Sequence, residues 1–311
     1  MDINMKGTNE WISFGPGDSY HISPGHLPKF SGGETVMMEF SNDPTYTNDN
    51  FLKQLNFYVI EHTFKAGKAE EWWGNFAKIM GEPDGMAKMT KAQHDNGFHN
   101  HSFMPGMTAD GIAHCVWEAA PGKTAADMQA FIDGEYGPSM GCMDNVVLGP
   151  VDASQAQLGY MSYFANNTAI ATEPIKGSTI YMVQHHIKPG KGEALFANMG
   201  KIMSEPGAQE GMDEKLKAQG FKNHSFFPLQ GKTEGLFACC IWEAKEGLGV
   251  ADVEKMMENH WAVGGFCDNK VFAIDCTKAM VGLSQKFAPH ASAIKGAAPS
   301  GVPAATTKSV A

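Results

Sequence analysis

The chain has 311 residues, enough for two domains that each bury a core of their own. Hydrophobic residues make up 43% of it and charged residues 19%, which is typical of a globular protein and excludes a wholly disordered one. The formal net charge is -10, without a basic stripe or an arginine cluster, so nucleic acid is not an expected partner. No apolar run approaches the roughly 18 residues that a membrane span needs.

Residues 1–52 form an arm rich in Gly, Pro, Ser, Asn and Asp, with isolated large apolar side chains. We expect one short strand over Val36–Phe40 and irregular structure elsewhere in this arm. The first six residues show neither the basic-then-apolar order of a signal peptide nor the arginine-rich pattern of a transit peptide. We therefore expect a cytoplasmic protein, or one from which a targeting segment has been removed.

The next segment alternates predicted strands and helices. Phe57–Phe64 is rich in aromatic and β-branched residues and predicts a strand. Ala69–Met80 has apolar residues at helical spacing and predicts a helix, which Pro83 ends. Two strands, a short helix and a last strand are expected over Phe98–Met104, Ile112–Ala119, Ala125–Ile132 and Asn145–Val151. The order β-α-β-β-α-β most often folds into a four-stranded antiparallel sheet with both helices on one face.

The same pattern occurs twice, because Phe57–Asp152 recurs as Ile180–Asp275. Asn-His-Ser-Phe appears at residues 100–103 and 223–226, and Trp-Glu-Ala at 117–119 and 242–244. This duplication divides the chain into an N-terminal arm (1–52), a first repeat (53–152), a linker (153–179), a second repeat (180–279) and a C-terminal arm (280–311). The linker is too apolar for a free tether, whereas the end of the C-terminal arm has the composition of a disordered tail.

The strand ending in Val-Trp-Glu-Ala (116–119) or Ile-Trp-Glu-Ala (241–244), followed by a short helix and a strand carrying Asp-Asn, resembles the single-unit proteins of the dimeric α+β-barrel superfamily. That resemblance implies an α+β fold in which two ferredoxin-like sheets pack face to face. Here the two repeats of one chain would form an internal pseudo-dimer between extended arms. A sheet with helices on one face leaves its other face in need of cover.

His62 and His185 occupy one position of the repeat, on strand faces that are otherwise apolar. We interpret them as core or barrel-lining histidines with satisfied hydrogen bonds; the alternative is a ligand-binding or proton-transferring role. Glu118 and Glu243 also recur, each beside a repeated tryptophan. We interpret these two as solvated strand ends, with acids at the barrel mouth as the alternative.

No metal site or bound cofactor is predicted. His101 and His224 recur in the Asn-His-Ser-Phe segments, but in the expected sheet the third strand separates each of them from the histidine of the first strand. The exchange of His114 for Cys239 between the repeats is weak evidence by itself. The six cysteines show no C-x-x-C spacing and are expected to be reduced and buried. Nucleotide-binding loops, nucleophile elbows and zinc-protease motifs do not occur in the sequence.

Two classes of function remain open, and the first is a structural subunit that assembles with copies of itself. Its interface candidates are large apolar side chains scattered through the non-repeating segments: Trp11, Phe14, Tyr160, Tyr163, Phe164 and Phe287. The alternative role for these residues is to cover the barrel of their own chain. The arms favour this class, because an enzyme barrel does not need so much of its chain outside it.

A tandem repeat of this size between long arms is similar to the pyrenoid shell proteins of diatoms, with the paired Asn-His-Ser-Phe and Trp-Glu-Ala segments as the matching motifs. This resemblance implies a protein that tiles into a sheet around the Rubisco matrix and limits CO2 leakage. It also implies a chloroplast location, with a transit peptide already removed.

The second class is an enzyme, as the barrel superfamily implies. The barrel would hold a small apolar molecule and act as a cofactor-independent oxygenase or isomerase. His62, His185, Glu118 and Glu243 are then the residues to test.

Overall fold

A computed structural model describes residues 56–108, 110–134, 137–153, 155–157, 164 and 177–281, together with the backbone of three short strands near the N-terminus. Residues Met1–Asp43 form one compact unit and Pro44–Ala311 another. In the first unit, β1 (Asp2–Asn4) pairs with β2 (Trp11–Ser13) and β3 (Leu27–Lys29) in an antiparallel sheet. The strand expected at residues 36–40 lies outside the described residues.

The first repeat begins with β4 (Asn56–Phe64) and contains one helix more than the sequence predicts. After β4 come α2 (Ala69–Gly81), α3 (Gly85–Asp95), β5 (Phe98–Met104), β6 (Ala113–Ala119), α4 (Ala125–Asp133) and β7 (Met143–Pro150). The strands form an antiparallel sheet in the order β5-β6-β4-β7.

The second repeat follows the same plan. It contains β8 (Ser178–Ile187), α5 (Gly192–Ser204), α6 (Ala208–Ala218), β9 (Phe221–Pro228), β10 (Gly235–Lys245), α7 (Val250–Glu258) and β11 (Cys267–Ile274). Its sheet order, β11-β8-β10-β9, is the order of the first sheet read from the other edge. The predicted α+β class with two ferredoxin-like repeats is confirmed.

The additional helices are α3 and α6, which the sequence does not predict. Pro83 ends α2 as expected, but the chain turns at once into α3, where Gly85 is required because a Cβ atom there would overlap the carbonyl oxygen of Ile79. Gly85 and Gln93 are the buried residues of α3, and α6 has none. Each helix packs on its repeat through only a few large apolar side chains, such as Leu216 of α6, so the periodic pattern in the sequence is weak.

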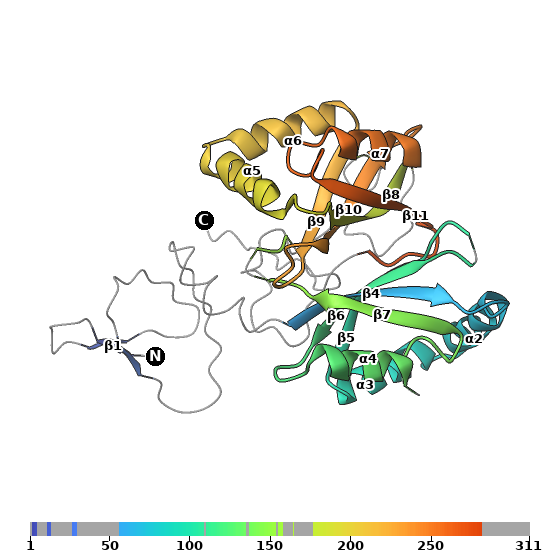
Figure 1. Cartoon of the computed structure of the whole chain (residues 1–311). Helices are drawn as coiled ribbons and strands as arrows, with labels where there is room; N and C mark the ends of the chain where they lie inside the picture. Colours follow the sequence, from blue (N-terminus) through green and yellow to red (C-terminus); the bar gives the residue numbers. More distant parts are fainter. Residues whose placement is uncertain are drawn as a thin grey trace, which may run out of the picture. The chain divides into compact units, whose positions relative to one another are not determined.

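Each sheet is covered on both faces. Figure 1 shows α2, α3 and α4 outside one sheet and α5, α6 and α7 outside the other, with the two sheets facing each other between them. Tyr58, Ile60 and Trp117 point toward the helices, whereas their neighbours Phe57 and Val59 point toward the other sheet. A core shared by both repeats fills the space between the sheets: Phe57, Val59, Met104, Val116, Val151, Ala153, Ile180, Met182, Phe227, Leu229, Cys239, Ile241, Ile274 and Val281.

Backbone hydrogen bonds join the repeats reciprocally. Past β11, Met280 exchanges two hydrogen bonds of 2.7 Å with Phe103 at the edge of the first sheet. Past β7, Gln157 exchanges two of 2.9 Å with Phe226, the equivalent residue of the second sheet. The end of each repeat therefore covers the edge strand of the other, which removes two open sheet edges. In the described ranges, no helix combines the length and the apolar character that crossing a membrane demands.

Candidate functional site

Four polar side chains meet between the two sheets. Glu61 lies on β4 and His114 on β6 of the first repeat, while Gln184 and His186 lie on β8 of the second. Alternation along the strands places them on the inner faces, because Val59 on β4 and Met182 on β8 belong to the shared core. The cluster therefore depends on both repeats.

The amide of Gln184 links the cluster. Its Nε2 donates to Glu61 Oε2 over 2.6 Å and lies 3.0 Å from His114 Nε2, while its Oε1 accepts from His186 Nε2 over 3.3 Å. A carboxylate can only accept, so the contact with Glu61 fixes which end of the amide is nitrogen. His114 Nε2 also lies 3.6 Å from Glu61 Oε2.

The carboxyl group of Glu61 carries a negative charge at neutral pH. The neighbouring His114 ring is the main cause that lowers its pKa to about 2; burial acts in the opposite direction, and the bond from Gln184 adds to the lowering. Its side chain is 23% exposed, so water reaches it. Partial burial lowers the pKa of His186, which keeps this imidazole neutral at pH 7.

The four candidates from the sequence do not come together. Glu118 lies between the sheets, whereas His62 shares the opposite, helix-facing side with Tyr58 and Ile60. The same holds for Glu243 and His185 in the second repeat. The two glutamates therefore lie between the sheets, and the two histidines lie on the sides that face the helices.

Glu118 and Glu243 are not solvated strand ends, and that interpretation was wrong. Their side chains are 1% and 0% exposed, because the face of each sheet that was expected to meet water is covered by the opposite sheet. His101 Nε2 lies 2.9 Å from Glu118 Oε2, and His224 Nε2 lies 2.7 Å from Glu243 Oε2. Burial lowers the pKa of both histidines, and the paired carboxylate opposes that shift.

The glutamate of the His224–Glu243 pair also forms hydrogen bonds with the linker. Glu243 Oε1 accepts from Ser178 Oγ over 2.7 Å and from the backbone N–H of Phe164 over 3.1 Å. Phe164 is half-buried and is the interface candidate whose side chain the structure describes. The side chains of the other five candidates lie outside the described residues: Trp11, Phe14, Tyr160, Tyr163 and Phe287.

His62 and His185 are buried, and each forms a hydrogen bond with a residue of the neighbouring strand. Their Nδ1 atoms lie 2.6 Å from the Oδ1 atoms of Asn145 and Asn269. Burial lowers the pKa of both imidazoles to about 4, so both are neutral at pH 7. His185 Nε2 accepts from the Cys240 thiol over 3.1 Å, whereas His62 Nε2 has no hydrogen-bond partner among the described residues. The core interpretation fits this geometry; a barrel-lining position does not.

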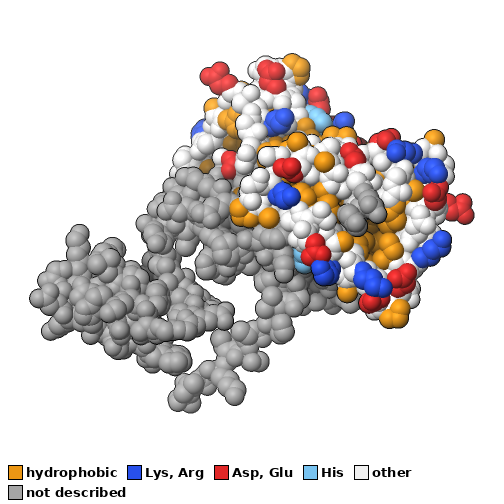
Figure 2. Space-filling model, turned by 90° about the horizontal axis from the view of Figure 1, so that it is seen from below, with side chains coloured by type: hydrophobic (Ala, Val, Ile, Leu, Met, Phe, Trp, Pro, Cys, Tyr) orange, Lys and Arg blue, Asp and Glu red, His pale blue; other side chains and the backbone are white. Residues whose placement is uncertain are grey.

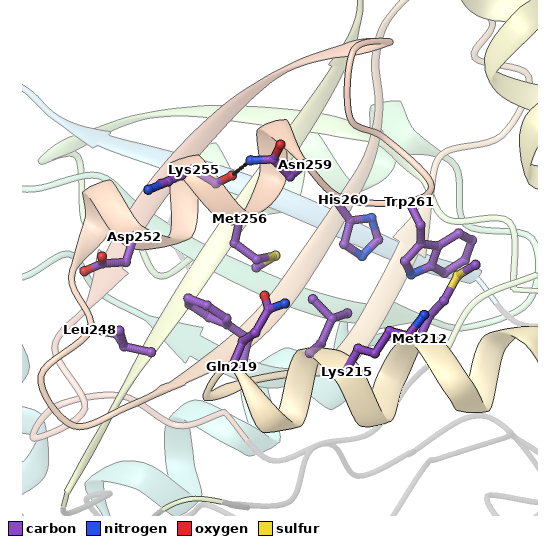
Figure 3. A pocket seen from close by; sticks show the side chains of 12 residues that line it. Met212, Lys215, Gln219, Leu248, Asp252, Lys255, Met256, Asn259, His260 and Trp261 are labelled. Atoms are coloured by element: carbon purple, nitrogen blue, oxygen red, sulfur yellow. Dashed lines mark hydrogen bonds between the residues drawn. The ribbon is translucent and has the colours of Figure 1, made fainter.

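A hollow of about 540 Å³ lies outside the second sheet, between α6 and α7. Figure 3 shows Met212 and Lys215 entering it from α6 and Met256 from α7, with His260 and Trp261 at one end. Burial lowers the pKa of His260 to about 3, and its Nδ1 accepts from the backbone N–H of Ala262 over 3.2 Å. The hollow therefore offers apolar side chains and a neutral imidazole.

Sequence reasoning missed the cluster between the sheets. Its signal was available, since the repeat alignment sets Glu61 against Gln184 and His114 against Cys239. Only the structure shows that the first two touch. Within the described ranges, no three or more His, Cys, Asp or Glu side chains are grouped so that they could hold a metal ion.

A family model described as Domain of unknown function (DUF8652) matches the chain twice, at residues 57–157 and 180–283. No curated protein matches the chain significantly. Among solved structures, a proposed monooxygenase from Lactobacillus acidophilus NCFM is 9% identical over 71% of this chain and 93% of its own, with a TM-score of 0.35. A mutant chlorite dismutase from Candidatus Nitrospira defluvii is 10% identical over 75% of this chain and 95% of its own, with a TM-score of 0.40. Similarity of this degree supports no conclusion about activity.

Proposed function

Since this chain belongs, through both repeats, to the DUF8652 family, we propose that the paired repeats act as a solid building block of a self-assembling structural protein. The observation that carries this proposal is the filled space between the sheets. An enzyme barrel needs room for a substrate, but here fourteen buried apolar residues from both repeats occupy that space. Two hollows in the described part of the chain, one between α6 and α7 and one beside the start of α2, lie on the outer surface.

The surface supports the proposal. Met80 at the end of α2 and Met203 at the equivalent position of α5 are 53% and 61% exposed. Met80 ends the run of apolar residues at helical spacing that predicts α2, and a position facing the core was expected for it, so its exposure is a correction. In the view of Figure 2, hydrophobic side chains lie among charged ones on the outside of the molecule. Apolar groups at equivalent positions of a two-fold body offer two related contact surfaces, which an extended assembly requires.

The finer form of the proposal is a sheet-like shell around the Rubisco matrix of a pyrenoid, in the chloroplast, that limits CO2 leakage. It is supported by the tandem organisation between long arms and by the paired Asn-His-Ser-Phe and Trp-Glu-Ala segments. Its partners would be copies of this chain and components of the matrix.

Negative-stain electron microscopy tests the assembly. We expect sheets or tubes from the full-length protein and discrete particles from a version that lacks residues 1–52 and 282–311. The variant Met80→Glu/Met203→Glu is expected to weaken assembly, whereas Lys78→Ala/Lys201→Ala, an equally repeated and exposed pair on the same helices, is its matched control. Discrete particles from the full-length protein at high concentration would overturn the proposal.

A second candidate is an enzyme that performs acid–base chemistry on a small apolar molecule. The specific observation in its favour is the partly exposed polar cluster between the sheets, in which an ionised Glu61 lies beside His114 and a neutral His186. Mass spectrometry of small molecules that co-purify with the native protein tests this candidate. A molecule retained by Glu193→Gln on the exposed surface but lost from His114→Ala would support it; one that survives both changes would remove this site from consideration.

A further inference from the structure

Two equivalent residues of the repeats touch each other. Glu61 and Gln184 align in the duplication, both lie on the central strand that starts their repeat, and their side chains meet at 2.6 Å. When equivalent residues of two like units are in contact, they lie at the two-fold axis that relates the units. Glu61 and Gln184 therefore mark the pseudo-two-fold axis between the sheets.

Most contacts between the repeats do not distinguish one repeat from the other. The reciprocal bonds of Phe103 with Met280 and of Phe226 with Gln157 join backbone atoms, which are the same in every residue. The shared core is apolar throughout, and apolar contacts tolerate exchange. With these contacts alone, a first repeat could pair with the first repeat of another chain.

We infer that the Glu61–Gln184 contact makes the first repeat pair with the second and excludes pairing of two first repeats. At the axis, two first repeats would set Glu61 against its own copy, with two partly buried carboxylates at hydrogen-bonding distance. One glutamate and one glutamine instead form a charge-assisted hydrogen bond. This inference rests on the pairing of the repeats and not on the proposed assembly.

The difference between His114 of the first repeat and Cys239 of the second also favours pairing of a first repeat with a second one. His114 Nε2 lies 3.0 Å from the Gln184 amide nitrogen, so one histidine and one amide complete the cluster. Two first repeats would bring two histidines and two carboxylates but no amide. Two second repeats would bring two amides and two buried thiols but no carboxylate to accept from them.

Three full-length variants test the inference through thermal unfolding. Gln184→Glu creates the forbidden carboxylate pair and is expected to lower the Tm at pH 8 by roughly 5–10 °C. At pH 5 this loss shrinks, because one of the two carboxyls then takes up a proton. Glu61→Gln leaves two neutral amides and has a smaller effect.

Several titratable or charged groups act electrostatically on Glu61 from the strands packed around it: His62, His114, His186, Cys239 and Lys270. Titration of His62 and His186, whose pKa values burial lowers, also changes the stability of the wild type between the same two pH values. Each variant is therefore compared with the wild type at pH 5 and at pH 8, and the difference between the two proteins reports the carboxylate pair.

The exchanged variant Glu61→Gln/Gln184→Glu decides the matter, because it restores one acid and one amide with the positions reversed. We expect it to recover most of the Tm that Gln184→Glu loses. A merely structural role for each residue predicts instead that the two losses add. No loss in Gln184→Glu, or no recovery in the exchanged variant, would overturn the inference.

Pairing itself is measured by refolding from denaturant at high protein concentration, followed by size-exclusion chromatography with light scattering. We expect Glu61→Gln to form several-fold more cross-paired dimers than the wild type, and the exchanged variant to return to the wild-type level. Glu193→Gln, which removes one exposed carboxylate, is the matched control. Association through the arms is common to all these proteins and cancels in the comparison. Equal dimer fractions in all of them would contradict the pairing role.

Discussion

Met182→Ala is expected to destabilise both repeats, although it changes one strand of the second. Met182 lies on the inner face of β8, is fully buried, and contacts a core to which Val59 and Val116 of the first repeat contribute. Its side chain therefore stabilises the pairing of the sheets as well as its own repeat. The control is Met203→Ala on α5, where the methionine is 61% exposed.

The magnitude follows from the atoms removed. Truncation deletes three heavy atoms, each worth about 0.8 kcal/mol when buried. The shared core collapses only partly, and a residual cavity of roughly 50 Å³ adds about 1.2 kcal/mol. The free energy of unfolding should fall by about 3–4 kcal/mol and the Tm by roughly 10 °C. The exposed control should change stability by no more than about 0.5 kcal/mol.

Urea unfolding gives the free energy, and hydrogen exchange with mass spectrometry shows where protection is lost. We expect a single transition, with faster exchange in peptides from β4 as well as from β8. A loss confined to β8, with a second transition for an unaffected first repeat, would refute the shared core. So would a change in free energy as small as that of Met203→Ala.

Three further predictions concern other parts of the molecule. Burial lowers the pKa of His62 and His185 from 6.5 to about 4, so below pH 6.5 the unfolded chain binds more protons than the folded one. The free energy of unfolding should therefore fall by about 3 kcal/mol per histidine between pH 6.5 and pH 4. Urea unfolding at several pH values measures this dependence, which His62→Asn/His185→Asn should flatten. Burial raises the pKa of Cys240 to about 12, so native protein should react with iodoacetamide at this thiol far more slowly than unfolded protein does, as peptide mass spectrometry will show. A chain that ends at residue 275 loses both backbone hydrogen bonds between Met280 and Phe103 as well as the burial of Val281. Its unfolding free energy should fall by roughly 2–5 kcal/mol relative to a chain that ends at residue 281.

The strands and the duplication could be predicted from the sequence because both leave a local pattern. The strand predicted over Phe98–Met104 matches β5 to the residue, and the helix predicted over Ala69–Met80 falls one residue short of α2. The helices α3 and α6 could not be found in this way, since few of their residues are large and apolar. A helix that packs on the rest of the fold through so few apolar side chains leaves only a weak periodic pattern in the sequence.

The error on Glu118 and Glu243 has a different physical origin. A strand that alternates apolar and polar residues is normally interpreted as half-solvated, with its polar face in water. Here both faces of each sheet are covered, so a polar residue on the inner face must find a buried partner, which His101 and His224 supply. The partners lie 17 and 19 residues away on neighbouring strands, a distance at which sequence alone shows no connection.

The reciprocal bonds explain why the repeats occur in tandem. Gln157 and Met280 lie beyond the last strands of their repeats, yet each completes the sheet of the other. A single repeat would leave β5 or β9 with an open edge and its inner face exposed. Two separate chains could supply the same cover, but they would lose the entropy of association, a loss that the linker reduces. Fusion also allows the two copies to diverge at the axis, and only then can Glu61 meet a glutamine instead of its own copy.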